Sequence, residues 1–422
     1  MNCRHCDTEL RSRFVDLGTA PRSNAYLTAE QLSSPENWYP LRVMVCEGCW
    51  LLQTEDDAHA EDLFSPDYAY FSSFSTTWLK HAERFVTEAV RRFELGPESL
   101  LVEVAANDGY LLQYVQQCGI RCYGVEPTAA TAAAARKRGI EITEEFFGRR
   151  LARELASERG LANLMVANNV LAHTPDINDF VAGFAILLEP NGVAVFEIPY
   201  LLRLVAENQF DTIYHEHFSY LSLTSVEHVF KANGLAVFDV ERLVTHGGSL
   251  RLFAQRSDTG QRPVSNSVRE LLQHESDVGL KSLSYYQGFQ TQAERIKDDF
   301  LQYLLDAKRA GRKVAAYGAA AKGNTFLNFA GIRADLIPFV VDRNPEKQGK
   351  YLPGSRIPIV GEDYLTSQRP DDIVILPWNL KDEVIQQLAY ASRWNATFVT
   401  AIPSLCVHRP VSWKRQFELK SA

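Results

Sequence analysis

Five short apolar runs, separated by stretches of helical periodicity, constrain the fold of this chain more than any other feature. Apolar runs of this length that alternate with helices are typical of the strands of a parallel α/β sheet. A central α/β unit is therefore the first prediction from the sequence. The runs cover residues 100–104, 121–125, 140–142, 164–167 and 193–198.

Two further runs follow these five. Residues 235–243 and 249–256 flank His246-Gly247-Gly248, whose glycines favour a tight turn. We expect an antiparallel hairpin at this place. Five parallel strands followed by such a hairpin resemble the class I methyltransferase sheet, which is Rossmann-like.

Changes in composition divide the chain of 422 residues into four parts. Residues 1–60 are bracketed by cysteines and rich in turns, which predicts a zinc-binding module. Residues 61–256 hold the α/β sheet, and residues 257–309 form a helical connector whose clearest helix runs from about 283 to 310. Residues 310–422 begin again with strand, glycine loop and helix, which predicts a second, smaller Rossmann-like domain.

Charge and hydropathy exclude several classes of partner. The net charge of −8 and the isoelectric point of about 5.8 argue against binding to nucleic acid, because no basic stripe is present. No apolar run reaches the roughly 18 residues that a membrane span needs. The first residues lack the apolar segment of a signal peptide, so we expect a cytoplasmic protein. A monomer or weak homo-oligomer is expected.

Two cysteine pairs, Cys3-x-x-Cys6 and Cys46-x-x-Cys49, predict a metal site. Each pair places two thiolates on a tight turn, and two such turns complete a tetrahedral four-sulfur site for Zn²⁺. Four protein ligands leave no open position, so the zinc should be structural. The alternative is four reduced thiols without metal.

The loop after the first strand is the predicted binding site of a nucleotide-like methyl donor. Small residues allow backbone N–H groups to approach a ligand there, although alanines hold two positions where glycine is common. The residues assigned to this site are Glu103, Ala105, Asn107, Asp108 and Gly109.

Glu126, at the end of the second strand, strengthens this assignment. A carboxylate at that place can accept hydrogen bonds from both ribose hydroxyls. The alternative is a plain strand–loop–helix turn with Glu126 facing solvent. Asn168 and Asn169 end the fourth strand, where amides line the ligand crevice of such sheets. Residues 187–192 resemble the turn before the fifth strand of methyltransferases, which favours S-adenosyl-L-methionine over a hydride-transferring cofactor.

Over nearly its whole length the chain resembles the zinc-containing sugar C-3-methyltransferases, which act on nucleotide-linked 4-keto-deoxysugars. Tyr214-His215-Glu216-His217 is the most specific of the shared motifs. The others are the two cysteine pairs and residues 67–73, 103–109, 169–173, 197–200, 246–249 and 317–324.

The resemblance implies a reaction in which a base removes the C3 hydrogen of the sugar and the enolate attacks the methyl group of S-adenosylmethionine. It places Tyr70, His173, Tyr214, Glu216 and His217 in the active site. A histidine suits the base near neutral pH, and His217 is the residue that we assign to this role. Tyr214, Tyr70 or His173 could stabilise charge on O4, and Glu216 could orient a histidine or hold a hydroxyl.

Without the resemblance, each of these residues has a structural explanation. Residues 214–217 could be a polar surface turn, and His173 could be a satisfied structural histidine. Tyr70 could face a core together with Tyr68.

The loop at residues 317–324 resembles a phosphate-facing loop with small residues and a cation, Lys322, but it lacks P-loop spacing. Either it helps to hold the diphosphate of the nucleotide–sugar, or the unit is a Rossmann-like remnant that only closes the cleft. We favour the first.

Two rival functions remain at this point. One is an O- or N-methyltransferase with the same donor site. The other is a non-enzymatic, zinc-anchored interaction module that binds no methyl donor.

Overall fold

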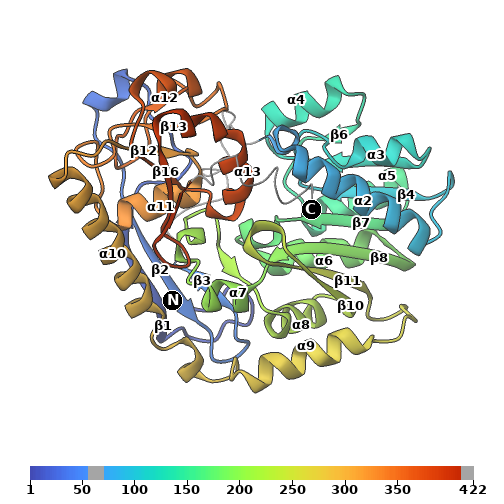
Figure 1. Cartoon of the computed structure of the whole chain (residues 1–422). Coiled ribbons are helices and arrows are strands. Elements are labelled where there is room, and N and C mark those ends of the chain that lie inside the picture. Colours follow the sequence, from blue (N-terminus) through green and yellow to red (C-terminus); the bar gives the residue numbers. More distant parts are fainter. Residues whose placement is uncertain (56–70, 410–422) are drawn as a thin grey trace, which may run out of the picture. The chain divides into compact units, whose positions relative to one another are not determined.

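The computed structural model describes residues 1–55 and 71–409 of the chain (Figure 1). They belong to two compact units, each built from three segments. The first unit contains Met1–Phe14, Val43–Leu202 and Glu216–Tyr286, and the second contains Val15–Arg42, Arg203–His215 and Gln287–Ala422. The domain boundaries expected near residues 60, 256 and 309 stay a prediction.

A seven-stranded sheet in the order β10-β11-β8-β7-β4-β5-β6 is the centre of the first unit. Strands β4 to β8 pair in parallel, while β11 pairs antiparallel with both β8 and β10. The predicted parallel strands and terminal hairpin are therefore confirmed. The strands are β4 (Leu100–Val104), β5 (Arg121–Val125), β6 (Ile142–Thr143), β7 (Ala162–Asn168), β8 (Leu188–Pro199), β10 (Leu235–Leu243) and β11 (Ser249–Arg256).

Helices cover both faces of this sheet because successive side chains of a strand point to opposite sides. Leu164 and Val166 of β7 belong to a core cluster with side chains of α2, α3 and α4. Phe196 of β8 instead contacts Phe184 of α6 and Phe230 of α8. The helices are α2 (Thr76–Arg92), α3 (Leu112–Gln117), α4 (Ala129–Lys137), α5 (Arg149–Arg159), α6 (Ile177–Leu187), α8 (Leu223–Ala232) and α9 (Asn266–Asp277), with α7 (Leu201–Ala206) following β8.

A small sheet in the order β1-β2-β3-β9 lies beside the cysteine pairs in the sequence and was not predicted. Strand β3 pairs antiparallel with β2 and with the distant β9, through partners such as Leu52 and Tyr220. The pairing with β9 is long-range, so the local sequence of residues 1–60 could not reveal it. The strands are β1 (Ser12–Ala20), β2 (Tyr39–Val45), β3 (Leu52–Thr54) and β9 (Ser219–Tyr220).

The second unit contains a six-stranded sheet in the order β14-β13-β12-β15-β16-β17. All its pairs are parallel except that of β17 at the edge, which confirms a second, smaller Rossmann-like unit. The strands are β12 (Val314–Tyr317), β13 (Val340–Val341), β14 (Ile359–Val360), β15 (Asp372–Ile375), β16 (Thr397–Thr400) and β17 (Cys406–His408). The helices are α10 (Phe289–Arg309), α11 (Ala321–Phe329), α12 (Glu362–Gln368) and α13 (Lys381–Gln387).

Short 3₁₀ helices join these elements in both units. In the first unit they are η2 (Ser72–Phe74), η3 (Leu171–His173), η5 (Thr245–Gly247) and η6 (Leu283–Tyr286). In the second unit they are η1 (Glu30–Ser33), η4 (Phe210–Thr212), η7 (Trp378–Leu380) and η8 (Ala389–Trp394).

Two predicted boundaries are wrong. The helix expected from about residue 283 begins at Phe289, because Gly288 has a φ of +88° and interrupts the helical path. The turn expected at residues 187–192 is instead the start of β8, where the register of pairing with β7 shifts between Ala162 and Leu164. Within the described residues, no helix is long and apolar enough to cross a membrane.

Candidate functional site

The two cysteine pairs form matching turns. In each, the N–H of the residue after the second cysteine donates to the carbonyl of the first, from Asp7 to Cys3 (3.0 Å) and from Trp50 to Cys46 (2.8 Å). Asp7 and Trp50 both have a φ of +60°, so the chain reverses sharply after each pair. The same backbone geometry thus presents both cysteines of each pair.

All four Sγ atoms of these turns lie within 4.8 Å of one another. Cys3 and Cys49 are 3.6 Å apart and Cys6 and Cys46 are 3.5 Å apart. Thiolates bound tetrahedrally to one zinc ion are separated by about 3.8 Å, so the cluster fits Zn²⁺. Hydrogen bonds from Cys46 and Cys49 hold the pKa of Cys3 below its ordinary value, which favours the thiolate that a metal requires.

The loop after β4, where we expect the methyl donor (the donor loop), contains three residues in the left-handed region although two of its positions hold alanine. Ala105 and Asn107 have φ values of +59° and +50°, and Gly109 has +77°. A Cβ at Gly109 would lie 2.2 Å from Cδ1 of Ile140, so only glycine fits there. The donor loop therefore favours glycine at position 109 and holds Ala105 and Asn107 in the left-handed region.

Side chains of this loop are held by residues that sequence reasoning missed. The N–H of Ser72 donates to Oδ1 of Asn107 at 2.9 Å. Asp108 accepts hydrogen bonds from Ser73 and pairs with Arg138, whose Nη1 is 3.3 Å from Oδ2. Ser72 and Ser73 belong to the shared motif at residues 67–73, but that motif does not reveal their contact with this loop, and Arg138 belongs to no motif.

Two buried carboxylates flank the donor loop. Glu126 accepts from the N–H groups of Asn107 (2.9 Å) and Thr128 (3.0 Å), and burial raises its pKa against these hydrogen bonds. Each oxygen of a carboxylate has a second lone pair, so Glu126 can still accept from a ligand. Burial also raises the pKa of Glu103 well above its usual range, although a hydrogen bond with the side chain of Tyr110 acts in the opposite direction.

Asn168 and Asn169 lie where β7 ends, as predicted for the ligand crevice. Nδ2 of Asn168 donates to the hydroxyl of Tyr110 at 3.2 Å. Asn169 has a φ of +53°, and its N–H donates to the carbonyl of Glu197 at 2.7 Å. Its Oδ1 is buried and has no partner in the part of the chain that the structure describes. A ligand donor could satisfy this oxygen.

The structure brings His173 and His217 together. Their ring centroids are 4.5 Å apart and the planes meet at 76°. His173 ends η3, just after β7, while His217 comes from the tetrad and has only 9% of its surface exposed. Burial lowers the pKa of His173 to about 4, although a hydrogen bond to the backbone of Glu216 acts in the opposite direction.

The other tetrad residues differ in their surroundings. Glu216 is buried in the first unit. Tyr214 is partly exposed in the second unit, where the ring of His215 lies edge-on to Tyr39 at 5.9 Å and its Nε2 is 3.2 Å from the carbonyl of Pro40. Tyr70 lies outside the described residues. The tetrad is therefore no solvated surface turn.

A buried ionic cluster at the end of β8 was also missed. Glu197 accepts from Nε2 of His81 (2.7 Å) and from Thr245 (2.7 Å), and Arg251 lies 3.4 Å away. Burial opposes ionisation of Glu197, but these partners, His81 first, outweigh it and lower its pKa. The sequence signal that could have indicated this cluster is an acidic residue inside an apolar run. Glu103 has the same feature.

Two groups of the loop at residues 317–324 already have hydrogen-bond partners within the second unit. The N–H of Ala319 donates to Asp342 at 2.8 Å, and Nζ of Lys322 donates to Asn379 at 2.8 Å while lying over the Trp378 ring. Gly318 has a φ of +90°. A phosphate at this loop would have to compete with those bonds, so its binding there stays a prediction.

Three protein-family models match the chain in succession. Residues 3–64 match the family described as "Putative zinc binding domain", and residues 78–240 match "Methyltransferase domain". Residues 244–403 match "C-methyltransferase C-terminal domain". The four-cysteine cluster lies in the first of these matches, and the five parallel strands β4 to β8 of the seven-stranded sheet lie in the second.

The chain is also similar to individual proteins. The C-methyltransferase NovU of Streptomyces niveus is 34% identical over 401 residues, which cover 95% of both chains. The ubiquinone biosynthesis O-methyltransferase of Rhodopseudomonas palustris is 22% identical over 166 residues, 34% of this chain and 66% of that protein. Magnesium protoporphyrin IX methyltransferase of Synechocystis, solved with bound SAH, gives a TM-score of 0.34 at 16% identity, covering 42% of this chain and 83% of that one. On the NovU match and the family models, this chain belongs to the C-methyltransferase family: it is an S-adenosylmethionine-dependent enzyme with a class I methyltransferase fold and a four-cysteine zinc module.

Proposed function

We propose that this enzyme methylates C3 of a nucleotide-linked 4-keto-6-deoxysugar through an enolate. The observation that carries the proposal is the buried contact of His173 with His217, next to the end of β7. Methyl transfer to carbon needs a general base, because a C–H bond is not nucleophilic until its proton has been removed. Two adjacent imidazoles supply such a base and a neighbouring hydrogen-bond partner.

The proposed reaction consists of proton removal followed by methyl transfer. The base takes the C3 proton, the C3–H electron pair moves into an enolate, and negative charge develops on O4. C3 then attacks the methyl group of S-adenosylmethionine, whose carbon–sulfur bond breaks with its electron pair remaining on sulfur. S-adenosylhomocysteine and the C3-methylated ketone leave, and the base returns its proton to water.

The pKa of His173 decides which histidine suits the base role. With a pKa of about 4, His173 is neutral at pH 7 and is a weak proton acceptor. We therefore assign proton abstraction to His217 and assign to His173 a neutral hydrogen bond that orients His217 or the sugar. In this proposal Tyr214 stabilises the charge on O4, with Tyr70 as a second donor, and Glu216 orients an imidazole or a sugar hydroxyl.

The donor loop serves as the proposed site of S-adenosylmethionine. Glu126 would hold the ribose hydroxyls, as a carboxylate at the end of the second strand does in related sheets. The unpartnered Oδ1 of Asn169 would meet a polar group of the donor, which would satisfy an atom that is costly to bury alone. Glu103 would line the same site. Ala105, Asn107, Asp108, Gly109 and Asn168 complete this proposed site.

Hydrogen exchange at C3 tests the carbon-acid step apart from methyl transfer. Wild-type enzyme with S-adenosylhomocysteine and a panel of nucleotide-linked 4-keto-6-deoxysugars in D₂O should incorporate deuterium at C3. His217→Asn should lose this exchange while keeping its affinity for S-adenosylhomocysteine. His274→Asn is the matched control, because His274 is an exposed histidine of α9. Unchanged exchange in His217→Asn removes that residue from the base role.

An O- or N-methyltransferase with the same donor loop is the alternative. It needs no carbon acid, so its acceptor would be methylated without deuterium appearing at any carbon.

A further inference from the structure

Arg4 lies inside the first cysteine pair, and its side chain contacts three distant segments of the first unit. Its Nη1 donates to the carbonyl of Pro175 at 3.0 Å, and its Nη2 donates to the carbonyl of Thr54 at 3.1 Å. Its Cζ lies 5.2 Å from the centroid of the Phe218 ring. One guanidinium thus joins the turn that carries Cys3 and Cys6 to three other parts of the chain.

Each of these segments adjoins the histidine pair. Pro175 comes two residues after His173, and Phe218 directly follows His217. Thr54 donates its hydroxyl to the carbonyl of His217 (3.4 Å) and its N–H to the carbonyl of Phe218 (3.1 Å). The contacts of Arg4 therefore converge on the backbone that carries the two imidazoles.

The two histidine segments are also bonded to each other. The N–H of Phe218 donates to the carbonyl of Ala172 at 2.8 Å. His173 also makes a hydrogen bond to the backbone of Glu216. Arg4 adds a further link, because its planar guanidinium contacts Pro175 of one segment and Phe218 of the other.

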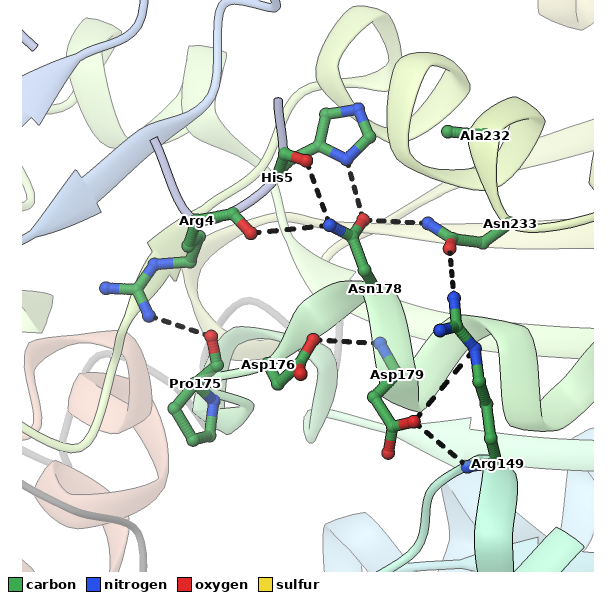
Figure 2. Close-up of a pocket in the computed structure, with 9 residues that line it drawn as sticks. All are labelled: Arg4, His5, Arg149, Pro175, Asp176, Asn178, Asp179, Ala232 and Asn233. Carbon is green, nitrogen blue, oxygen red and sulfur yellow. Dashed lines mark hydrogen bonds and ion pairs between the residues drawn. The ribbon is translucent and has the colours of Figure 1, made fainter. Parts of the chain in front are cut away.

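His5 supplies a second contact from the same cysteine pair, and Figure 2 shows it beside Arg4. Nδ1 of His5 lies 2.8 Å from Oδ1 of Asn178, and Nδ2 of Asn178 donates to the carbonyl of His5 at 2.9 Å. Asn178 lies in the first turn of α6, and Asn233 donates to the same Oδ1 at 2.8 Å. The start of α6, which follows Pro175, is therefore also tied to the metal-site turn.

We propose that Arg4 is a positioning residue, which sets the relative placement of the imidazoles of His173 and His217 from the zinc module. This inference rests on the proposed function of that pair. Arginine is required because its planar fork can donate to two carbonyls while stacking on a ring. A lysine ammonium can make one of these carbonyl contacts but cannot span both in the same geometry.

Two substitutions in the full-length enzyme test this role. Arg4→Met keeps an apolar stem over Phe218 and removes both hydrogen bonds. It should lower kcat on the order of 10²-fold, because small displacements of catalytic groups cost that much. Zinc content and KM for S-adenosylmethionine should not change. Arg4→Lys should recover part of the lost kcat. Arg11→Met is the control, since Arg11 is exposed and pairs with Glu9.

A spectroscopic measurement separates this inference from the proposed function. Long-range ¹H–¹⁵N correlation spectra of histidine-labelled enzyme report both imidazoles without any sugar, and His173→Gln and His217→Asn assign their signals. In Arg4→Met these two signals should shift, whereas in Arg11→Met they should not. If wild-type enzyme methylates no keto-sugar but the shifts occur, the proposed substrate fails and the positioning role stands.

Other outcomes overturn the positioning role. Unchanged imidazole signals with normal kcat in Arg4→Met would show that the contacts do not orient the pair. Loss of zinc in both Arg4 variants would show instead that Arg4 only anchors the cysteine turn.

Discussion

Ala105 makes the loop after β4 difficult to recognise from the sequence. Its position after β4 has a φ of +59°, a conformation that glycine adopts without strain and alanine does not. The sequence indicated a weak motif because alanine stood where glycine is common. Ala105 nevertheless adopts this conformation, and Gly109 stands where a Cβ would lie 2.2 Å from Cδ1 of Ile140.

Replacement of Ala105 by glycine should therefore stabilise the protein. Glycine relieves the strain of the left-handed conformation, but it also gives the unfolded chain more conformational freedom. The net effect should raise the free energy of unfolding by about 0.5–1 kcal/mol. Urea denaturation measures this change as a higher midpoint at constant slope. Ala106→Gly is the matched control and should destabilise, because Ala106 is fully buried and has no positive φ. Equal destabilisation by both substitutions would contradict the strain at Ala105.

His173 should make the stability of the enzyme fall in acid. Its folded pKa of about 4 lies below the ordinary value of 6.5, so the unfolded state binds the proton more tightly. Its contribution is present above pH 6.5 and is lost as pH falls towards 4. The full shift is worth roughly 3 kcal/mol.

Denaturation curves of wild type and His173→Gln between these pH values test this expectation. As pH falls, the free energy of unfolding of the wild type should decrease more than that of His173→Gln. A difference that does not depend on pH would mean that His173 is not held neutral by burial.

At the level of elements, the strands were predicted better than their connections. Strand β4 matches its apolar run residue for residue, because the run is buried along its whole length. Strand β6 is shorter than expected, and α10 starts late because Gly288 breaks the helix. The pairing of β3 with β9 depends on partners far apart in the chain, which local patterns do not reveal.

The two cysteine turns should behave as one element that requires its metal. Cys46→Ser with Cys49→Ser removes two of four sulfur ligands, so bound zinc and folding yield should both fall, because metal binding is coupled to folding. Elemental analysis and the yield of soluble protein measure these two quantities. Cys118→Ser is the control, since Cys118 is exposed and outside the cluster. Full zinc content in the double variant would contradict the assigned ligands.

For the whole molecule, the sequence predicted which residues lie at strand ends better than which side chains contact one another. The donor loop, Glu126 and the histidines could be assigned from their places at strand ends and from the family resemblance. The bonds of Glu197 with His81, and of Arg4 with Pro175, could not. Such pairs form only when the chain has folded, and the motifs that contain Glu197 and Arg4 do not identify His81 or Pro175 as their partners.

The position of the new methyl group tests the central claim most directly. The enzyme would be incubated with [¹³C-methyl]S-adenosylmethionine and the panel of nucleotide-linked 4-keto-6-deoxysugars, and the product examined by ¹³C NMR. We predict a labelled methyl group coupled to C3 of the sugar, in a product whose C4 ketone is retained. A labelled methyl group on oxygen or nitrogen would contradict the account.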